Sequence, residues 1–362
     1  MMNTFGTKIK LSIFGESHGN GIGIVIDGLP PGIKIDRDYI ATQMARRAPG
    51  RDEFSTPRKE LDGVEILSGL FNGFTTGAPL TGLIRNTNTR SQDYDRVFRP
   101  SHADWPAYVK YMGFEDYRGG GHFSARITAP LMWAGAICKQ VLKETYDMKI
   151  YGRIQSIANV TDMVDTDDII KDARNNAGLY QQLIDVPFPA LEPAANAFKE
   201  AITAARMDLD SVGGTIEIVA LDVPAGLGSP FFDSFESTLA HLLFSVPGVK
   251  GVEFGAGFDI TKLRGSVAND QLEIVDDKVK ALSNNSGGIQ GGITTGMPIV
   301  ARVALKPTAS IGKKQHMVDA KDAPELKSVD TQIHGRHDPC IVPRAVPIVE
   351  SCMAIVLLDQ LI

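Results

Sequence analysis

Arginine, histidine and glycine are concentrated in residues 96–126 of the chain. This stretch contains four arginines, two of the chain's seven histidines and three consecutive glycines at 119–121. Arginine presents a planar fork of N–H donors that matches a phosphate or a carboxylate. Glycine has no Cβ, so its backbone N–H groups can approach an anion closely. A plain turn with solvated arginines is the alternative, but the coincidence of these residue types predicts an anion-binding site.

Two further groups have the same character. The segment G-E-S-H-G forms a tight loop between two strand-like runs, and its flanking glycines expose Ser17 and His18. The segment G-R-H-D-P-C brings Arg336 close to Asp338. A single histidine in a loop is more often structural than catalytic, so the prediction for His18 depends on the other groups.

A fourth group follows a strand-like run in the second half of the chain. The loop K-P-T-A-S offers one cation, Lys306, and two hydroxyls, Thr308 and Ser310. This set suits a phosphate or the polar edge of a ring. A solvated lysine at the end of a strand explains the loop equally well.

A short helix is predicted to carry two of the arginines. Residues 37–47 follow Asp36, which is a favourable N-cap residue, and they end with Arg46 and Arg47 before a Pro-Gly pair. The two arginines are candidates for substrate binding. Alternatively, they only compensate the partial negative charge at the helix C-terminus.

A long helix is predicted directly after the glycine-rich loop. Residues 129–146 are mostly good helix formers and are apolar on most faces, so we expect this helix in the core. Thr128 is the expected N-cap residue. The glycine-rich loop would then lie at a helix N-terminus, where the helix dipole favours negative charge.

Strand-like and helix-like stretches alternate along the rest of the chain. Apolar alternation and glycine punctuation predict strands at 8–14, 62–70, 79–85, 149–160, 212–223 and 249–258. Further helices are predicted at 193–207, 232–245 and 342–362. No tandem repeat or linker composition is evident, so one compact α/β or α+β domain over 1–362 is expected. Glycine-rich loops recur in both halves, which is consistent with a pseudo-symmetric pair of lobes.

Composition excludes several classes of protein. The 362 residues carry a net charge of −6, which disfavours general nucleic-acid binding, since that binding is dominated by the phosphate backbone. No apolar run is long enough to span a bilayer. The three cysteines are widely spaced and predict neither a disulfide framework nor a zinc site. A zinc site on His102, His334 and His337 lacks helical spacing, so no metal is predicted. We expect a reducing, cytoplasmic location.

Taken in order, these motifs resemble the chorismate synthase family over nearly the whole chain. The resemblance also includes longer motifs, which are R-R-x-P-G at 46–50, E-I-L-S-G-L-F-N-G-F-T-T-G at 65–77, R-S-Q-D-Y at 90–94, V-P-A-G-L-G-S-P at 223–230, V-K-G-V-E-F-G-A-G-F at 249–258, S-G-G-I-Q-G-G-I-T-T-G at 286–296 and A-L-K-P-T-A-S-I at 304–311. So many long motifs in one order make the resemblance highly specific.

The resemblance implies a fold and a reaction. The fold would be an α+β, β-α-β sandwich with helices packed between antiparallel sheets, in pseudo-symmetric halves and usually in a homotetramer. The reaction would be the 1,4-anti elimination of phosphate from 5-enolpyruvylshikimate 3-phosphate to give chorismate, late in the shikimate pathway. It would require reduced FMN without net redox change. Intrinsic NADPH:FMN reduction or a separate flavin reductase could supply the reduced flavin.

The resemblance also implies roles for individual residues. His18 and His102 match the two acid–base histidines, and Asp338 matches the carboxylate that handles a flavin proton. The expected FMN-binding residues are His122, Phe123, Ser124, Gly291, Lys306, Pro307, Thr308, Ala309, Ser310 and Arg336. The expected substrate-binding residues are Ser17, Arg46, Arg47 and Arg126, with Arg336 as a further candidate.

The chain departs from the usual family pattern around the glycine-rich loop. His122, Phe123 and Ile127 stand where the family pattern has Arg, Ser and Glu. A titratable imidazole therefore replaces a permanent cation, and we expect ligand affinity to depend more on pH. Glu53 also stands where an arginine is common, so no nucleotide contact is assigned to it.

Two other functions are compatible with these motifs. The first is a non-catalytic protein that binds flavin or a phosphoanion on the same scaffold. The presence of His18, His102 and Asp338 together argues against it, because simple binding would not require all three. The second is a flavin oxidoreductase that uses NADPH for a net reduction, although the chain has no dinucleotide-binding fingerprint.

Overall fold

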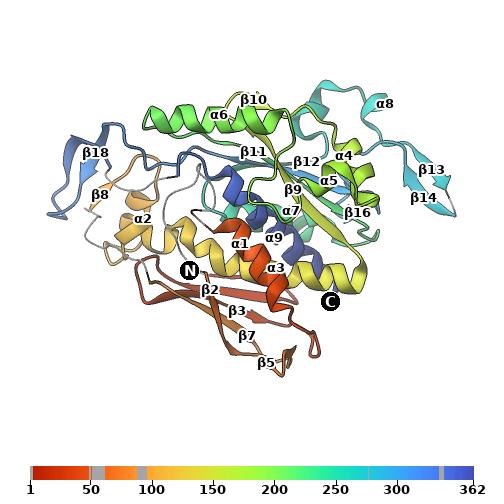
Figure 1. Ribbon diagram of the computed structural model, residues 1–362, viewed down its shortest axis with the longest axis horizontal. Coiled ribbons are helices and arrows are strands. Elements are labelled where there is room, and N and C mark those ends of the chain that lie inside the picture. The colour runs from red at the N-terminus through yellow and green to blue at the C-terminus, as the bar shows by residue number, and fades with distance from the viewer. Residues whose placement is uncertain (1–2, 49, 51–61, 88–95, 276, 334–337) are drawn as a thin grey trace.

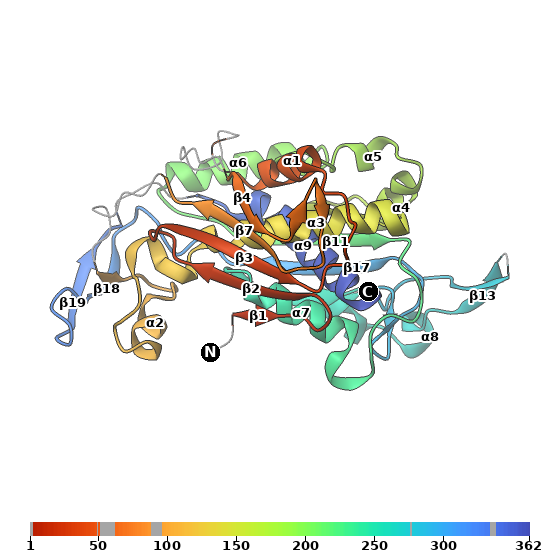
Figure 2. The ribbon, with the colours of Figure 1, turned by 90° about the horizontal axis from the view of Figure 1, so that it is seen from below.

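Two five-stranded antiparallel sheets lie on either side of a layer of helices (Figures 1 and 2). The computed structural model describes residues 3–48, 50, 62–87, 96–275, 277–333 and 338–362. The first sheet has the strand order β1 (Thr4–Phe5), β2 (Lys10–Gly15), β3 (Gly21–Asp27), β7 (Leu80–Arg85), β4 (Val64–Ser68). The second sheet has the strand order β10 (Val160–Thr161), β9 (Lys149–Ile157), β11 (Gly214–Leu221), β17 (Ile299–Leu305), β12 (Val249–Phe254).

Helices fill the space between the two sheets. The helix α3 (Thr128–Tyr146) packs on the first sheet, α9 (Val342–Leu361) packs on the second, and the two helices pack on each other. Their close approach requires Gly135, because a Cβ there would lie 2.0 Å from the Cβ of Ser351. The helices α1 (Arg37–Arg47) and α7 (Phe235–Ser245) pack beside them.

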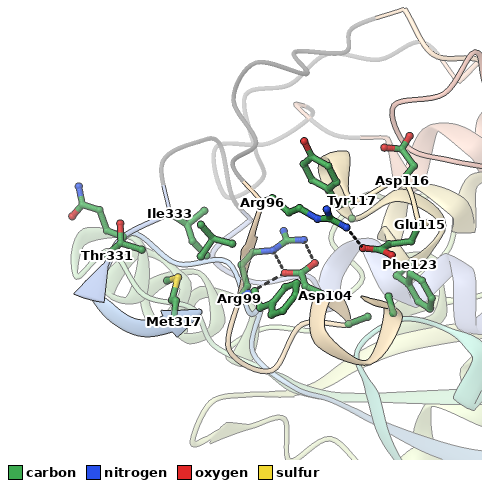
Figure 3. A pocket seen from close by; sticks show the side chains of 16 residues that line it. Arg96, Arg99, Asp104, Glu115, Asp116, Tyr117, Phe123, Met317, Thr331 and Ile333 are labelled. Atoms are coloured by element: carbon green, nitrogen blue, oxygen red, sulfur yellow. Dashed lines mark hydrogen bonds and ion pairs between the residues drawn. The ribbon is translucent and has the colours of Figure 1, made fainter. Parts of the chain in front are cut away.

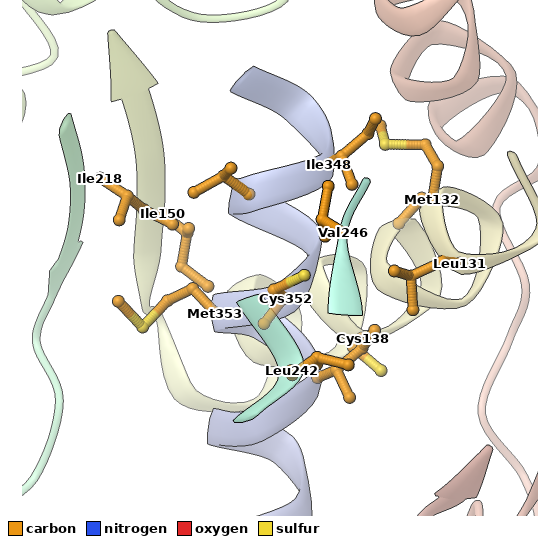
Figure 4. Close-up of a cluster of buried hydrophobic side chains, with 14 of the residues drawn as sticks. Leu131, Met132, Cys138, Ile150, Ile218, Leu242, Val246, Ile348, Cys352 and Met353 are labelled. Carbon is orange, nitrogen blue, oxygen red and sulfur yellow. The ribbon is translucent and has the colours of Figure 1, made fainter. Parts of the chain in front are cut away.

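The apolar side chains between the sheets form one cluster that includes residues from both halves of the chain. Figure 4 shows members of this cluster from three helices: Leu131 and Met132 of α3, Leu242 of α7, and Cys352 and Met353 of α9. Both long helices are buried on nearly all faces, as expected for a layer enclosed by two sheets. The predicted α+β sandwich with helices between antiparallel sheets is therefore confirmed.

The same succession of elements occurs twice along the chain. In the N-terminal half (residues 10–146), β2, β3, α1, β4, a hairpin, β7 and α3 follow one another. In the C-terminal half (residues 149–361), β9, β11, α7, β12, a hairpin, β17 and α9 do the same. The hairpins are β5 (Leu70–Phe71) with β6 (Phe74–Thr75), and β15 (Ile289–Gln290) with β16 (Ile293–Thr294). The pseudo-symmetric halves are thus a repeat of topology.

Other elements decorate this frame. The predicted strand over 149–160 folds back at Ala158, whose φ is 52°, and therefore becomes β9 and β10. The C-terminal half adds helices α4 (Thr166–Arg174), α5 (Gly178–Gln181), α6 (Ala194–Met207) and α8 (Gly265–Ala268), and the hairpin β13 (Leu272–Val275) with β14 (Lys278–Ala281). A three-stranded sheet combines strands from both halves in the order β19 (Lys327–Thr331), β18 (Gln315–Asp319), β8 (Val97–Phe98).

The region before α3 differs from its prediction. Thr128 is not an N-cap residue, because it lies inside the helix and its hydroxyl donates to the carbonyl of Ala125 at 2.6 Å. The cap is one turn earlier, where Ser124 Oγ accepts from the backbone N–H of Arg126 at 3.3 Å. The glycine-rich loop itself lies within the short 3-10 segment Arg118–Phe123, and a second 3-10 helix, Ala125–Ile127, separates it from α3.

Candidate active site

A cavity of about 790 Å³ lies where the two halves meet. Much of its lining comes from two segments that each lead from the five-stranded sheet of one half to the long helix of that half. We call residues 86–127 the N-terminal connecting segment and residues 306–341 the C-terminal connecting segment. Eight of the predicted FMN-binding residues line this cavity: His122, Phe123, Ser124, Lys306, Pro307, Thr308, Ala309 and Ser310. These residues are nearly two hundred positions apart in sequence, and only the fold brings them together.

The charge of the cavity lining is positive although the protein is acidic. Three permanent cations line it, Arg99, Lys250 and Lys306, together with three histidines. None of the described residues that line it is an aspartate or a glutamate. Burial, together with the nearby Lys250, lowers the pKa of Lys306, as expected where like charges share a site. An anionic ligand would relieve this repulsion.

The glycine-rich loop brings the two predicted catalytic histidines together. Gly119, Gly120 and Gly121 have φ values of 60°, 83° and 52°, a backbone conformation that favours glycine. A Cβ at Gly119 would lie 2.1 Å from Cε1 of His18, and one at Gly120 would lie 3.1 Å from Cε1 of His102. We predicted that these glycines leave room for an anion. The structure shows that they leave room for two imidazole rings.

His102 lines the cavity and is held from behind by charged groups. Its Nδ1 lies 2.6 Å from Oδ1 of Asp104, and Arg99 bonds to both carboxylate oxygens of Asp104, at 2.7 and 2.8 Å. Burial disfavours the charged carboxylate, but the hydrogen bonds from Arg99 and His102 outweigh it and hold the pKa of Asp104 well below its ordinary value.

Asp338 lies beside the C-terminal connecting loop. Its backbone carbonyl accepts a hydrogen bond from Thr308 Oγ1 at 2.7 Å. Its carboxylate pairs with Arg344 in the first turn of α9, and Arg344 also donates to the carbonyl of Arg47 at 3.0 Å. Asp338 therefore adjoins the cavity through Thr308, whereas His18 adjoins it through Gly119.

Arg47 and Arg126 are joined by a carboxylate. Nη1 of Arg47 bonds to one oxygen of Asp62 at 3.0 Å, and Nη1 of Arg126 pairs with the other. Arg47 also bonds to Thr128 Oγ1 and to the carbonyl of Ala125, both at 3.0 Å, and so fixes the start of α3. Burial opposes the charge on Asp62, but the two arginines hold its pKa below the ordinary value.

Arg126 also connects this pair to the loop that carries His18. Its Nε donates to Oδ1 of Asn86 at 3.4 Å, and the amide nitrogen of Asn86 donates to the carbonyls of Glu16 and Gly19, both at 2.9 Å. The backbone N–H of Ser17 donates to the carbonyl of Gly121 at 3.1 Å. The loop at 15–19 is thus fixed from two sides.

Arg46, the neighbour of Arg47, points into the core instead of toward the site. Its two terminal nitrogens bond to the carboxylate of Glu350 at 2.6 and 2.8 Å, and Lys139 shares this carboxylate at 2.6 Å. Arg46 and Glu350 are buried, so their side chains hold α1, α3 and α9 together. The prediction that Arg46 faces the substrate is corrected, because on a helix adjacent residues point in different directions.

Two predicted FMN-binding residues are not among those that line the cavity. Gly291 forms the turn between β15 and β16, and the space beside its Cα is open. Arg336 lies outside the described residues, as do residues 90–94 and Glu53.

Several residues of the site were missed in the sequence. Asp62, Asn86 and Asp104 were not singled out, although Asp104 follows His102 by two positions and this spacing was a usable signal. Residues 242–250, from the end of α7 to β12, also line the cavity. Their sequence reads as helix and strand, so only the packing of α7 shows that they face a ligand site.

The fold and the site define an α+β protein with a cationic cavity and two histidines that pack against one glycine-rich loop. The sequence profile described as chorismate synthase matches residues 9–362. A chorismate synthase of Pyrococcus abyssi is 45% identical over 99% of this chain and 97% of its own length. A chorismate synthase of Methanocaldococcus jannaschii is 43% identical over 100% of this chain and 97% of its own length. The chain belongs to the chorismate synthase family.

A solved structure agrees with this assignment. A crystal structure of chorismate synthase superposes with a TM-score of 0.72 at 29% identity, over 98% of this chain and 92% of that chain. The match covers both halves, so the repeated topology is common to the two proteins. None of the described helices is both long and apolar enough to cross a membrane.

Proposed function

We propose that this protein is a lyase that eliminates phosphate from 5-enolpyruvylshikimate 3-phosphate and forms chorismate. One observation carries the proposal: residues 122–124 and 306–310, far apart in the chain, line one cationic cavity that has His102 in its wall. The substrate carries one phosphate and two carboxylates. Binding such a trianion requires convergent cations, and the absence of carboxylates among the described lining residues avoids repulsion.

The residues of the cavity fit reduced FMN. Its volume of about 790 Å³ lies within the range of ligand pockets, about 300–1,000 Å³. Phe123, Leu131 and Pro307 offer apolar surface for a ring system, and Lys306 and Ser310 offer polar contacts. His122 to Ser124 and residues 306–310 would hold the flavin. When bound, reduced FMN would supply electron density to the reaction without net oxidation of the substrate.

His102 is the proposed general acid. The departing phosphate gains negative charge as its C–O bond breaks, and a protonated imidazole can donate to that oxygen. His102 lines the large cavity, within reach of a ligand there. General acid catalysis of this kind contributes about 10²- to 10⁴-fold to the rate.

His18 and Asp338 are proposed to serve the same cavity from its edges. A cationic His18, packed against Gly119, would offset negative charge on the bound flavin. Asp338, held by Thr308, would take up and return a proton. Ser17, Arg126 and Arg336 are the proposed substrate contacts. Arg47 acts with Asp62 in placing Arg126.

The test is anaerobic turnover. The protein is mixed with the substrate and dithionite-reduced FMN, and chorismate and phosphate are measured against an oxidised-FMN control. Equal amounts of both products support the lyase. Tight FMN binding without turnover would contradict it and support a non-catalytic flavin-binding protein. Consumption of NADPH in the presence of FMN alone would identify an intrinsic source of reduced flavin; without it, a separate reductase is required.

We also propose a homotetramer of single-domain chains in the cytoplasm. The cluster of buried residues that includes both halves favours one domain over 1–362. The hairpin β13–β14 presents Leu272, Ile274 and Val279 to solvent, and an isolated two-stranded hairpin is marginally stable, so a neighbouring chain would cover it. The three free, buried cysteines suit a reducing compartment. Sedimentation equilibrium of the wild type and of Ile274→Lys tests the assembly; a monomeric wild type would contradict it.

A further inference from the structure

His102 has a charged partner to which no role has yet been given. Oδ1 of Asp104 lies 2.6 Å from Nδ1 of His102. Three nitrogens of Arg99 hold the same carboxylate, because its backbone N–H bonds to Oδ2 at 3.0 Å and its guanidinium bonds to both oxygens. The Asp104 side chain is only 9% exposed, so its position is fixed by these contacts and not by solvent.

The contacts decide which ring nitrogen of His102 carries a proton. Nδ1 of His102 lies 3.0 Å from Nη2 of Arg99, but both nitrogens converge on Oδ1 of Asp104. Arginine cannot accept a hydrogen bond, and an ionised carboxylate cannot donate one. Nδ1 must therefore carry a hydrogen that it donates to Asp104. Nε2 remains as the atom that exchanges a proton on the opposite side of the ring.

Asp104 does not line the large cavity itself and reaches it through His102 and Arg99. It is absent from the residues that line the 790 Å³ cavity, and it lines instead a smaller cavity of about 110 Å³ behind the ring. Figure 3 shows Arg99 and Asp104 joined in this smaller cavity, next to the pair Arg96 and Glu115. A substrate bound in the larger cavity would therefore meet His102 and not Asp104.

Arg99 extends the arrangement to the other half of the molecule. Its Nη1 donates to Oγ of Ser310 at 3.2 Å, and Ser310 belongs to the loop 306–310 that lines the large cavity. The same guanidinium therefore fixes the partner of His102 and a loop proposed to hold the flavin. Movement of one would disturb the other.

We propose that Asp104 is the positioning residue of His102 and that Arg99 is its brace. Asp104 holds the ring with Nδ1 protonated, directs Nε2 toward the ligand and stabilises the imidazolium that donates to the leaving group. The catalytic consequence of this inference rests on the proposed function, whereas the protonation of the ring does not.

The first experiment tests the ring without any turnover. ¹⁵N NMR of protein labelled at histidine distinguishes the two neutral tautomers, and the spectrum of His102→Gln identifies the signals of His102. Neutral His102 in the wild type should carry its hydrogen on Nδ1. In Asp104→Asn, the amide can donate to Nδ1, so the hydrogen should move to Nε2. A wild-type ring protonated on Nε2 would overturn the inference, and this outcome does not depend on whether Asp104→Asn folds.

The second experiment measures kinetics. Asp104→Asn should lower kcat by about 10²- to 10⁴-fold, because a ring with its hydrogen on the wrong nitrogen cannot act as the general acid. KM for the substrate should stay within about twofold of the wild-type value, because Asp104 does not line the large cavity. The matched control is Asp330→Asn, which removes a carboxylate that contacts Nδ1 of the exposed His316 at 2.8 Å. Its kcat should match the wild type. Unchanged kcat in Asp104→Asn would sink the inference, whereas a wild type that makes no chorismate would sink the proposed function alone.

Discussion

The two halves of the chain share a frame and differ in what is attached to it. In the N-terminal half, Thr75 donates to the carbonyl of Pro30 at 2.7 Å and accepts from the N–H of Ile33 at 2.9 Å. In the C-terminal half, Thr294 makes the equivalent two bonds, to Pro224 and Leu227, at the same distances. Each threonine fixes a hairpin to the loop that precedes a helix. The two halves therefore share not only the order of their elements but also individual side-chain hydrogen bonds.

The sheets of the two halves meet solvent differently. Strands β9 and β11 are buried along most of their length, because α9 covers one face of the second sheet and α4 to α6 cover the other. Strand β7 alternates between buried and more exposed positions, as a sheet covered on one face should. The additional helices are inserted between β9 and β11, the place where the N-terminal half has the short loop with Ser17 and His18.

The comparison shows where function resides in a repeated fold. Both connecting segments run from the five-stranded sheet to the long helix of their half, and both meet at the cavity. The N-terminal connecting segment carries His102 with its partners Asp104 and Arg99. The C-terminal connecting segment carries Lys306 and the hydroxyls of Thr308 and Ser310. The two connecting segments thus occupy equivalent positions in their halves but carry different functional groups.

The largest expected effect separates the roles of the two connecting segments. His102→Ala should lower kcat by about 10²- to 10⁴-fold, because the proposed acid is lost. Lys306→Ala should weaken FMN binding about tenfold and leave kcat at saturating flavin within about threefold, because a charge-assisted contact is lost but no proton donor. Steady-state kinetics and flavin titration measure both. His316→Ala, at an exposed site, is the control for His102. Equal losses of kcat in both variants would remove this division of roles.

The next effect concerns the contact between the halves. Arg46→Ala should destabilise the protein by about 3–5 kcal/mol, because Glu350 remains buried without its main partner. Chemical denaturation measures the change. Arg85→Ala removes an ion pair with Glu65 whose side chains are 55% and 49% exposed, and it should change the stability much less, because solvent screens the pair. Similar values for the two variants would show that Arg46 does not join α1 to α9.

The same pair predicts a loss of stability in acid. Burial opposes the charge on Glu350, but Arg46 and Lys139 lower its pKa from 4.5 to about 2. A carboxyl whose pKa is lower in the folded state stabilises the fold above pH 4.5, and this stabilisation is lost as the pH falls toward 2. The wild type should lose more stability than Glu350→Gln over this interval. Parallel curves would contradict the prediction.

A smaller effect tests the equivalence of the halves directly. Thr75→Val and Thr294→Val should each destabilise the protein by about 1–3 kcal/mol, because a backbone N–H and a carbonyl lose their partner. The two sites are far apart, so the double variant should show the sum. Thr76→Val, at the exposed neighbour, is the control. A large effect in one half and none in the other would break the comparison.

The smallest effect concerns the titratable residue of the N-terminal connecting segment. His122 lines the cavity and donates through Nδ1 to the carbonyl of Gly15, at 2.7 Å, which leaves Nε2 as the ring nitrogen that can meet a ligand. The affinity of the wild type for FMN should fall a few-fold as the pH rises from about 6 to about 8, whereas the affinity of His122→Arg should not change over this interval. Level affinity in the wild type, with weaker binding in His122→Arg, would refute this expectation.

The sequence by itself determined the local structure and the family. Residues 37–47 form a helix with the predicted Asp36 cap, since capping and apolar spacing are local properties. The repeated topology also has a trace in the sequence, because F-N-G-F-T-T-G-A-P-L at 71–80 is similar to Q-G-G-I-T-T-G-M-P-I at 290–299. No tandem repeat is predicted from this similarity alone. Two short similar segments so far apart carry little weight until hydrogen bonds show that they are equivalent.

Only the tertiary structure decided the direction of side chains and the partners of charges. Arg46 and Arg47 are adjacent and alike in sequence, yet one binds Glu350 in the core and the other binds Asp62 beside the site. Nothing local distinguishes them, because the choice depends on which carboxylates the fold brings near each side of α1. The cavity has the same origin, since its walls come from segments that meet only after two separate sheets enclose the helices.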